Sequence, residues 1–131
     1  KNTLITHAVY LVDDAERAVV FLQEILNFRV SADELTSTGE RFLAMVHRSA
    51  AGLQLQIVIC DFHSEYAARK RHAGIVDYIV DTSDILAFIS MLGQLGIRIH
   101  KEPVETSYGI TAIFEDPFGN LWDLVQRPGV S

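Results

Sequence analysis

The side chains with ligand-binding chemistry are few and widely separated in this sequence. His7 lies near the start, Gln54 and Gln56 alternate with apolar residues in the middle, and Asp123 lies near the end. An imidazole, amide oxygens and a carboxylate can bind a divalent cation or hydrogen-bond an organic ligand. Both roles stay open for His7. For the glutamines the simpler interpretation is a polar strand face at solvent or at a dimer seam, and for Asp123 it is a strand-end carboxylate without function.

Several other classes of site are absent from the sequence. It has no Gly-x-Ser-x-Gly nucleophile turn, no Gly-rich phosphate loop and no dinucleotide-binding fingerprint. The net charge of −6 argues against nucleic acid and anionic membranes as partners. No apolar run approaches the ~20 residues of a membrane span. A single cysteine, Cys60, allows no internal disulfide and fits a reducing compartment, so we expect a cytoplasmic location.

Hydrophobic periodicity predicts the elements that must position these residues. In the first half a helix begins after Asp13-Asp14 and ends at Asn27, and in the second half a helix begins after Thr82 or Ser83 and ends at Gly96. Strands are predicted on both sides of these helices, at 6–12, 28–32, 42–47, 53–60, 75–80, 97–101, 109–115 and 121–126.

A polar segment at 61–73 separates the two halves. It has no apolar stripe and is interpreted as a connector, with Arg69-Lys70-Arg71 in a solvated loop. The halves repeat each other: Tyr10, Val12 and Asp13 recur as Tyr78, Val80 and Asp81, all 68 residues later. The sequence therefore predicts an α+β fold of tandem βαβββ modules. We expect one domain over 1–131, with module one at about 4–60, the connector at 61–73 and module two at about 74–127.

Two motifs resemble those of the vicinal-oxygen-chelate superfamily, which includes glyoxalases, bleomycin-resistance proteins and extradiol dioxygenases. The segment 6–14 with Leu26-Asn27-Phe28 resembles the family's opening strand, helix and turn, and 114–124 resembles its closing DPxGNxxEL motif. The resemblance implies a curved mixed sheet around a cleft, with the helices on the outer face. In the closing motif, Asp116 and Gly119 are expected to form the turn, and the returning strand places Asp123 opposite Trp122 and Leu124.

The resemblance also implies a metal site, which this chain carries only in part. In metal-dependent members, the first and last strands of each module supply four ligands for one divalent ion. His7 occupies the first such position, but its counterpart 68 residues later is Ile75, which cannot bind a metal. Gln54 matches Asp123 at an offset of 69, and loop lengths also allow Gln56 as the equivalent position. The resemblance thus leaves His7, Gln56 and Asp123 as metal ligands in an incomplete tetrad.

The rest of the cleft is expected to be largely apolar. Asp77 lies between Ile75 and Ile79 on the predicted fifth strand, where it either binds a cationic or hydroxyl-bearing ligand or pairs with a nearby arginine. Tyr108 resembles an aromatic side chain at the cleft mouth of family members. The expected apolar lining is Leu11, Val58, Ile113, Leu121 and Val125.

Two functions follow from these expectations. The first is a homodimeric protein that binds a small organic ligand in the cleft, like the drug-sequestering resistance members, without a complete metal site. The second is a lyase, isomerase or dioxygenase that acts on vicinal oxygens with Fe, Mn, Ni or Zn. A third interpretation is a binding module of a larger assembly. The expected ligand-binding residues are His7, Leu11, Gln54, Gln56, Ile75, Asp77, Tyr108 and Asp123.

Overall fold

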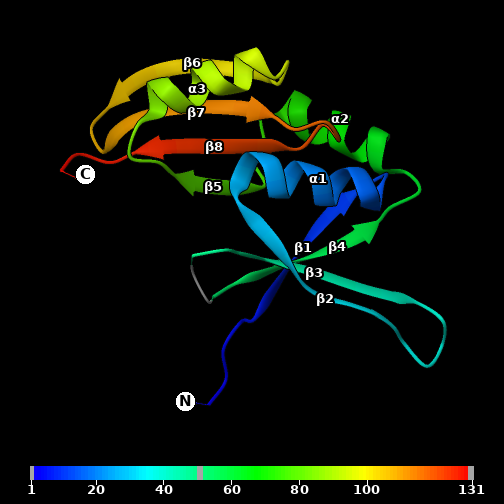
Figure 1. The fold of residues 1–131 in the computed structure, drawn as a ribbon. Coiled ribbons are helices and arrows are strands. Elements are labelled where there is room, and N and C mark those ends of the chain that lie inside the picture. The colour runs from blue at the N-terminus through cyan, green and yellow to red at the C-terminus, as the bar shows by residue number, and fades with distance from the viewer. Residues whose placement is uncertain (1, 50–51, 130–131) are drawn as a thin grey trace. The chain divides into compact units, whose positions relative to one another are not determined.

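The structure is a computed structural model that describes residues 2–49 and 52–129 (Figure 1). The chain divides into two compact units, unit one at residues 1–63 and unit two at 64–131. Each unit contains one four-stranded mixed sheet, and together the sheets repeat a βαβββ module in an α+β fold. The predicted fold class is confirmed. The expected module limits, 4–60 and 74–127, fall inside the two units.

Unit one follows the predicted order of elements. Its sheet has the strand order β1-β4-β3-β2, in which β1 is parallel to β4 and the other neighbours are antiparallel. Asp14 caps α1 by accepting a hydrogen bond from the amide of Arg17, and Asn27 ends the helix with a φ of 58°. The elements are β1 (His7–Val12), α1 (Ala15–Leu26), β2 (Phe28–Leu35), β3 (Arg41–His47) and β4 (Gln54–Ile59).

One face of the first sheet packs against α1. The helix contacts β2, β3 and β4, and it buries Ala18, Phe21, Leu22 and Leu26. On the sheet, Tyr10 is fully buried whereas its neighbour Val9 is 51% exposed. Alternate residues of a strand point to opposite faces, so the residues in phase with Val9 form the face opposite α1.

Unit two repeats this plan with an additional helix. Its sheet has the order β5-β8-β7-β6, with β5 parallel to β8. The N-cap of α3 is Asp84, whose side chain accepts from the amide of Ala87, so the expectation of Thr82 or Ser83 is corrected by one or two residues. Gly96 ends this segment with a φ of 74°. The elements are α2 (His63–Ala73), β5 (Tyr78–Asp81), α3 (Ile85–Gln94), β6 (Arg98–Thr106), β7 (Gly109–Glu115) and β8 (Leu121–Gln126).

An aromatic cluster fills the core of unit two on the side of α3. Trp122 stacks on Phe114 with ring centroids 5.9 Å apart and packs on Tyr78 at 4.6 Å. Phe88 of α3 joins the cluster with its ring centroid 6.1 Å from that of Phe114. Burial, followed by the charges of Asp77 and Asp116, raises the pKa of Tyr78 well above its usual value, so this phenol stays neutral.

The predicted connector contains a helix. Residues 63–73 form α2, so the expectation that Arg69-Lys70-Arg71 form a solvated loop is wrong. The buried stripe of α2 is His63, Ala67 and Lys70, which are 1%, 0% and 9% exposed. These positions have helical spacing but are polar, small or charged. The pattern therefore escapes a search for apolar periodicity.

The turn between β7 and β8 is organised by Asp116, as the sequence predicts. This carboxylate is 3% exposed. It accepts hydrogen bonds from the amides of Phe118 and Asn120 and from the side chains of Asn120 and Trp122. Gly119 adopts a φ of 87°, in the left-handed region that favours glycine. Asp116 and Gly119 therefore have the structural role expected of them.

Among the described residues, no helix combines the length and the apolar character needed to cross a bilayer.

Candidate functional site

The face of the first sheet opposite α1 carries most of the polar residues singled out in unit one. In the parallel ladder of β1 and β4, His7 lies opposite Gln54, Val9 opposite Gln56 and Leu11 opposite Val58. Partners in a ladder point to the same side of the sheet. These six residues, which we call the open face of unit one, are each partly or largely accessible to solvent.

His7 and Gln54 both make hydrogen bonds inside unit one. Nδ1 of His7 lies 2.8 Å from the hydroxyl of Thr6, and the ring packs edge-on against Phe42. The amide oxygen of Gln54 accepts from the hydroxyl of Ser31. If Nδ1 of His7 donates to Thr6, Nε2 can accept from a ligand or bind a metal; if Nδ1 accepts, Nε2 is a donor. The tautomer therefore decides which kind of partner His7 can take.

In unit two, Asp123 lies between two isoleucines. It is opposite Ile79 on β5 and Ile113 on β7, on the side of the sheet opposite the aromatic cluster. Its carboxylate is half-buried, and this burial raises its pKa. We call Ile79, Ile113 and Asp123 the open face of unit two. Leu121 and Val125, which were expected to line the same surface, are 1% and 2% exposed and do not form part of it.

Ile75 is not brought onto this face as a strand would place it, whereas Asp77 continues the pairing with β8 by one residue, its amide donating to the carbonyl of Leu121 at 2.9 Å. The fifth strand begins at Tyr78, later than predicted, because the amide of Ile75 is hydrogen-bonded to the carbonyl of Lys70 at the end of α2. Asp77 forms an ion pair with Lys70 at 2.7 Å, with side chains 19% and 10% exposed. The residue expected either to bind a ligand or to pair with an arginine thus pairs with a lysine.

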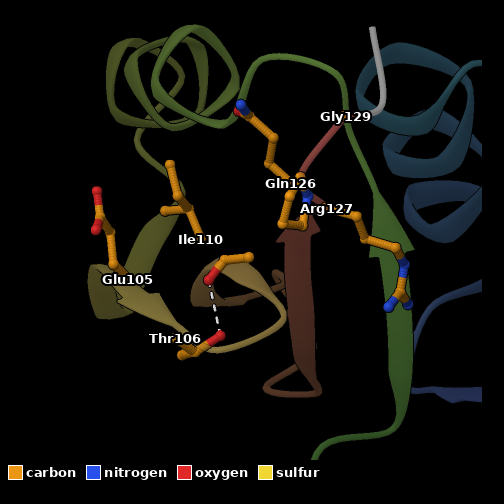
Figure 2. A pocket seen from close by; sticks show the side chains of 8 residues that line it. Glu105, Thr106, Ile110, Gln126, Arg127 and Gly129 are labelled. Carbon is orange, nitrogen blue, oxygen red and sulfur yellow. Dashed lines mark hydrogen bonds between the residues drawn. The ribbon is translucent and has the colours of Figure 1, made fainter.

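Tyr108 lies in the hairpin that connects β6 and β7, where its side chain is 53% exposed. Its amide donates to the hydroxyl of Thr106 at 3.4 Å. A hollow of about 300 Å³ lies beside this hairpin, between Thr106, Ile110 and the residues that follow β8 (Figure 2). None of the residues predicted from the sequence lines it.

The polar side chains at this hollow are already engaged. The amide oxygen of Gln126 accepts from the amide of Ile85, and the guanidinium of Arg127 contacts Asp81 at 3.2 Å. Figure 2 shows the Arg127 side chain directed towards β5 and Glu105 directed outwards. The hollow therefore offers backbone groups and Ile110, and we do not regard it as the candidate site.

The strand register changes how the two modules correspond. Tyr10 lies opposite Ile57, whereas its counterpart Tyr78 lies opposite Trp122. In matching positions of the two ladders, Asp123 therefore corresponds to Val58. The offset that paired Gln54 with Asp123 in the sequence, and the alternative with Gln56, do not describe matching positions in the sheets.

The donor set does not fit a four-ligand metal centre. Unit one supplies an imidazole and two amide oxygens, which are weak neutral ligands. In unit two Asp123 has isoleucines as both cross-strand neighbours, and Ile75, which follows His7 by 68 residues, cannot bind a metal. Across residues 2–49 and 52–129, no three His, Cys, Asp or Glu side chains are grouped so that they could hold a metal ion.

Three contacts around α2 were not predicted from the sequence. Besides the pair of Lys70 with Asp77, Arg71 donates to the carbonyl of Gly119 at 3.0 Å and lies 3.7 Å from Glu115. A Cβ at Gly119 would collide with the guanidinium of Arg71. The spacing of His63, Ala67 and Lys70 is the sequence signal that could have revealed this packing.

Comparison with known proteins gives a consistent picture. An uncharacterized protein of Shewanella frigidimarina (strain NCIMB 400) is 27% identical over 124 residues, which cover 93% of this chain and 92% of that protein. A Sphaerobacter thermophilus DSM 20745 member of the glyoxalase/bleomycin resistance protein/dioxygenase superfamily has a similar structure, with a TM-score of 0.74 at 25% identity, covering 95% of this chain and 98% of that one.

A further similar structure is that of TnmS3, an antibiotic-binding protein from Streptomyces sp. CB03234. Its TM-score is 0.72 at 24% identity, covering 95% of this chain and 96% of that one, so the similarity concerns the fold. Residues 4–124 match the family described as the Glyoxalase/Bleomycin resistance protein/Dioxygenase superfamily. With both modules and both terminal motifs accounted for by this match, the chain belongs to the Glyoxalase/Bleomycin resistance protein/Dioxygenase superfamily.

Proposed function

We propose that this protein binds a small organic ligand against the open faces of its sheets and does so without a complete metal tetrad. One observation carries the proposal: each sheet packs one face against a helix of its own unit and leaves large apolar side chains accessible on the other. Val9 is 51% and Ile79 65% exposed. Together with their polar neighbours on the same strands, these side chains give each face the mixed character of a ligand-binding surface.

Each open face, taken by itself, carries polar groups beside its apolar side chains. Small-molecule sites are mostly apolar and carry a few polar groups that fix orientation. Here those groups are His7, Gln54 and Gln56 in unit one and Asp123 in unit two. The antibiotic-binding protein TnmS3 shares the fold, and this supports a binding role. Ile75, Asp77 and Tyr108 lie outside the residues that define the two open faces, and their part in binding stays a prediction.

A metal-dependent lyase, isomerase or dioxygenase is the second candidate. The observation that favours it is the direct pairing of His7 with Gln54, which puts an imidazole and an amide side chain on the same side of the sheet. That pair alone is too few ligands for a catalytic ion, since open catalytic sites keep about three protein ligands.

Metal analysis distinguishes the two candidates. The protein is purified without added metal or chelator, its metal content is measured, and it is titrated with Fe(II), Mn(II), Ni(II) and Zn(II). We expect clearly less than one bound ion per chain and only weak binding on titration. Near-stoichiometric metal that is lost in His7→Ala and Asp123→Ala, but kept in the exposed His100→Ala control, would reverse the preference in favour of the enzyme.

Ligand binding is then tested directly by calorimetry with neutral and charged naphthalene derivatives. Binding that weakens in Ile79→Asp supports the open face of unit two as a site. Binding of none of these compounds contradicts the proposed function.

A further inference from the structure

Unit two contains two partly buried carboxylates with different surroundings. Nζ of Lys70 lies 2.7 Å from one oxygen of Asp77, and the lysine side chain is itself only 10% exposed. The same ammonium lies 4.7 Å from the ring centroid of Tyr66. The charge of Asp77 is thus compensated inside the chain, and a cationic ligand would have to displace a buried lysine to reach it.

Asp123 has no such partner within unit two. The ion pairs among the described residues of this unit join Lys70 to Asp77, Arg71 to Glu115 and Arg127 to Asp81, and none includes Asp123. Glu115 and Asp81 lie on the same side of the sheet as Asp123, but each of them is paired with an arginine. Lys101 lies one strand further away, opposite Ile113, and makes no ion pair with Asp123.

The immediate neighbours of Asp123 are apolar. Ile79 and Ile113 are its cross-strand partners on either side, and directly opposite side chains have their Cβ atoms about 5 Å apart. A half-buried carboxylate between two isoleucines loses part of its hydration without gaining a cation, which is unfavourable until something supplies the positive charge. The chain as a whole carries a charge of −6 and so attracts cations rather than anions.

We propose that the ligand of this protein carries an ammonium group that ion-pairs with Asp123, joined to an apolar body that rests on Ile79 and Ile113. The inference rests on the ligand-binding function proposed above and names its ligand class. Asp123 is then the residue that selects amines over alcohols and acids of the same shape. Asp77, the other candidate for cation binding, has a structural role.

Three probes of similar shape test this selection: 1-naphthylmethylamine, which is an ammonium ion at neutral pH, 1-naphthylmethanol, which is neutral, and 1-naphthoate, which is an anion. Their affinities are measured by calorimetry at pH 7.5. We expect the amine to bind about tenfold more tightly than the alcohol, equivalent to ~1.4 kcal/mol, and the acid to bind most weakly. Asp123→Asn should remove the preference for the amine and leave the alcohol almost unchanged.

Glu105→Gln is the matched control, because it removes one negative charge from the same unit on the other side of the sheet. The preference for the amine should survive in this variant. A second measurement needs no variant: with the wild type, affinity for the amine should fall as the pH is lowered and Asp123 takes up a proton, whereas affinity for the alcohol should not.

The outcomes separate the two proposals. Equal affinities for the amine and the alcohol, or a preference for the amine that survives in Asp123→Asn, would overturn the inference while the binding itself still supports the proposed function. If none of the three probes binds, both are overturned.

Discussion

Asp116 shows at the scale of one residue how the closing motif holds unit two together. Its buried carboxylate accepts two backbone amides, the Asn120 side chain and the indole of Trp122. In Asp116→Ala these donors lose their acceptor in a place that water reaches poorly. Each buried unsatisfied donor costs ~1–3 kcal/mol, so we expect the free energy of unfolding to fall by about 3 kcal/mol or more. Urea denaturation measures it, with the exposed Asp61→Ala as control; equal losses in both variants would contradict the role of Asp116.

The raised pKa of Asp123 predicts in which direction the stability of the protein changes with pH. Burial raises its pKa above the ordinary value of 3.8, so the folded chain holds a proton there more readily than the unfolded chain. The stability due to this group is therefore present below pH 3.8 and is lost as the pH rises through the higher folded pKa. Asp123→Asn does not titrate, and we expect its Tm to exceed that of the wild type by about 1–2 °C at pH 7. The gap should close towards pH 4.

Asp33→Asn should show the opposite pH dependence in the same measurement of Tm. Its hydrogen bond with Arg41 lowers the pKa of Asp33, so the stability from this group is present at neutral pH and is lost as the pH falls through the lowered pKa. This variant should be less stable than the wild type at pH 7 and should approach it in acid. Tm curves for Asp123→Asn that run parallel to the wild type at every pH would refute the assignment of a raised pKa to Asp123.

At the scale of the element, α2 makes charged contacts through Lys70 and Arg71, and we expect these contacts to stabilise it. In Lys70→Met the part-buried carboxylate of Asp77 loses the cation that it pairs with among the described residues, and its second oxygen already has no hydrogen-bond partner there. Removing one member of a buried pair costs ~3–5 kcal/mol, whereas replacing both by apolar residues is often neutral. We therefore expect Lys70→Met to be clearly destabilised and Lys70→Met with Asp77→Leu to regain more than half of the loss.

Chemical denaturation of the single and double variants measures this coupling, and hydrogen exchange at residues 63–73 shows whether the loss is local to α2. Arg69→Met is the control, because Arg69 is exposed on the same helix. A double variant less stable than either single variant would mean that the pair is not what holds α2.

The elements that were predicted correctly depend on local sequence patterns, whereas the element that was missed does not. Strands such as β4 and caps such as Asp14 and Asn27 depend on local alternation and on the backbone preferences of single residues, so their positions were predictable. Helix α2 was not, because its buried positions are occupied by histidine, alanine and lysine. The contacts of this helix also reach far along the chain, as Arg71 does with the carbonyl of Gly119, 48 residues later, and local periodicity does not reveal them.

The candidate site was likewise predictable only where local alternation along a strand decides it. Alternation along β1 and β4 places His7 and Gln54 on one face, and the structure pairs them directly. The correspondence between Gln54 and Asp123 was not predictable, because an offset between letters does not fix the register of two separate sheets. The partner of Asp77 also escaped prediction, since it lies on the unexpected helix.

For the whole molecule, the two modules have kept their backbone plan and diverged in chemistry. The strand pair His7 and Gln54 of unit one has no counterpart in the strands of unit two, where β5 begins at Tyr78 and β8 at Leu121, while Asp123 corresponds to Val58. One module therefore presents neutral hydrogen-bonding groups and the other a single negative charge among aliphatic side chains. Each unit therefore offers its own ligand chemistry: hydrogen-bonding groups in unit one, and a carboxylate between isoleucines in unit two.

Exposed apolar surface also predicts the state of assembly. Val9 on the open face of unit one is 51% exposed. Burial of apolar surface of this kind stabilises an assembly of two chains. We expect a homodimer, seen as twice the monomer mass in size-exclusion chromatography with light scattering. Val9→Asp should weaken the dimer by about tenfold or more, since an unpaired charge would be buried. Val20→Asp is the matched control, because Val20 is 55% exposed on α1. Equal weakening in both variants would place the contact elsewhere, and a monomer at every concentration would rule out the homodimer.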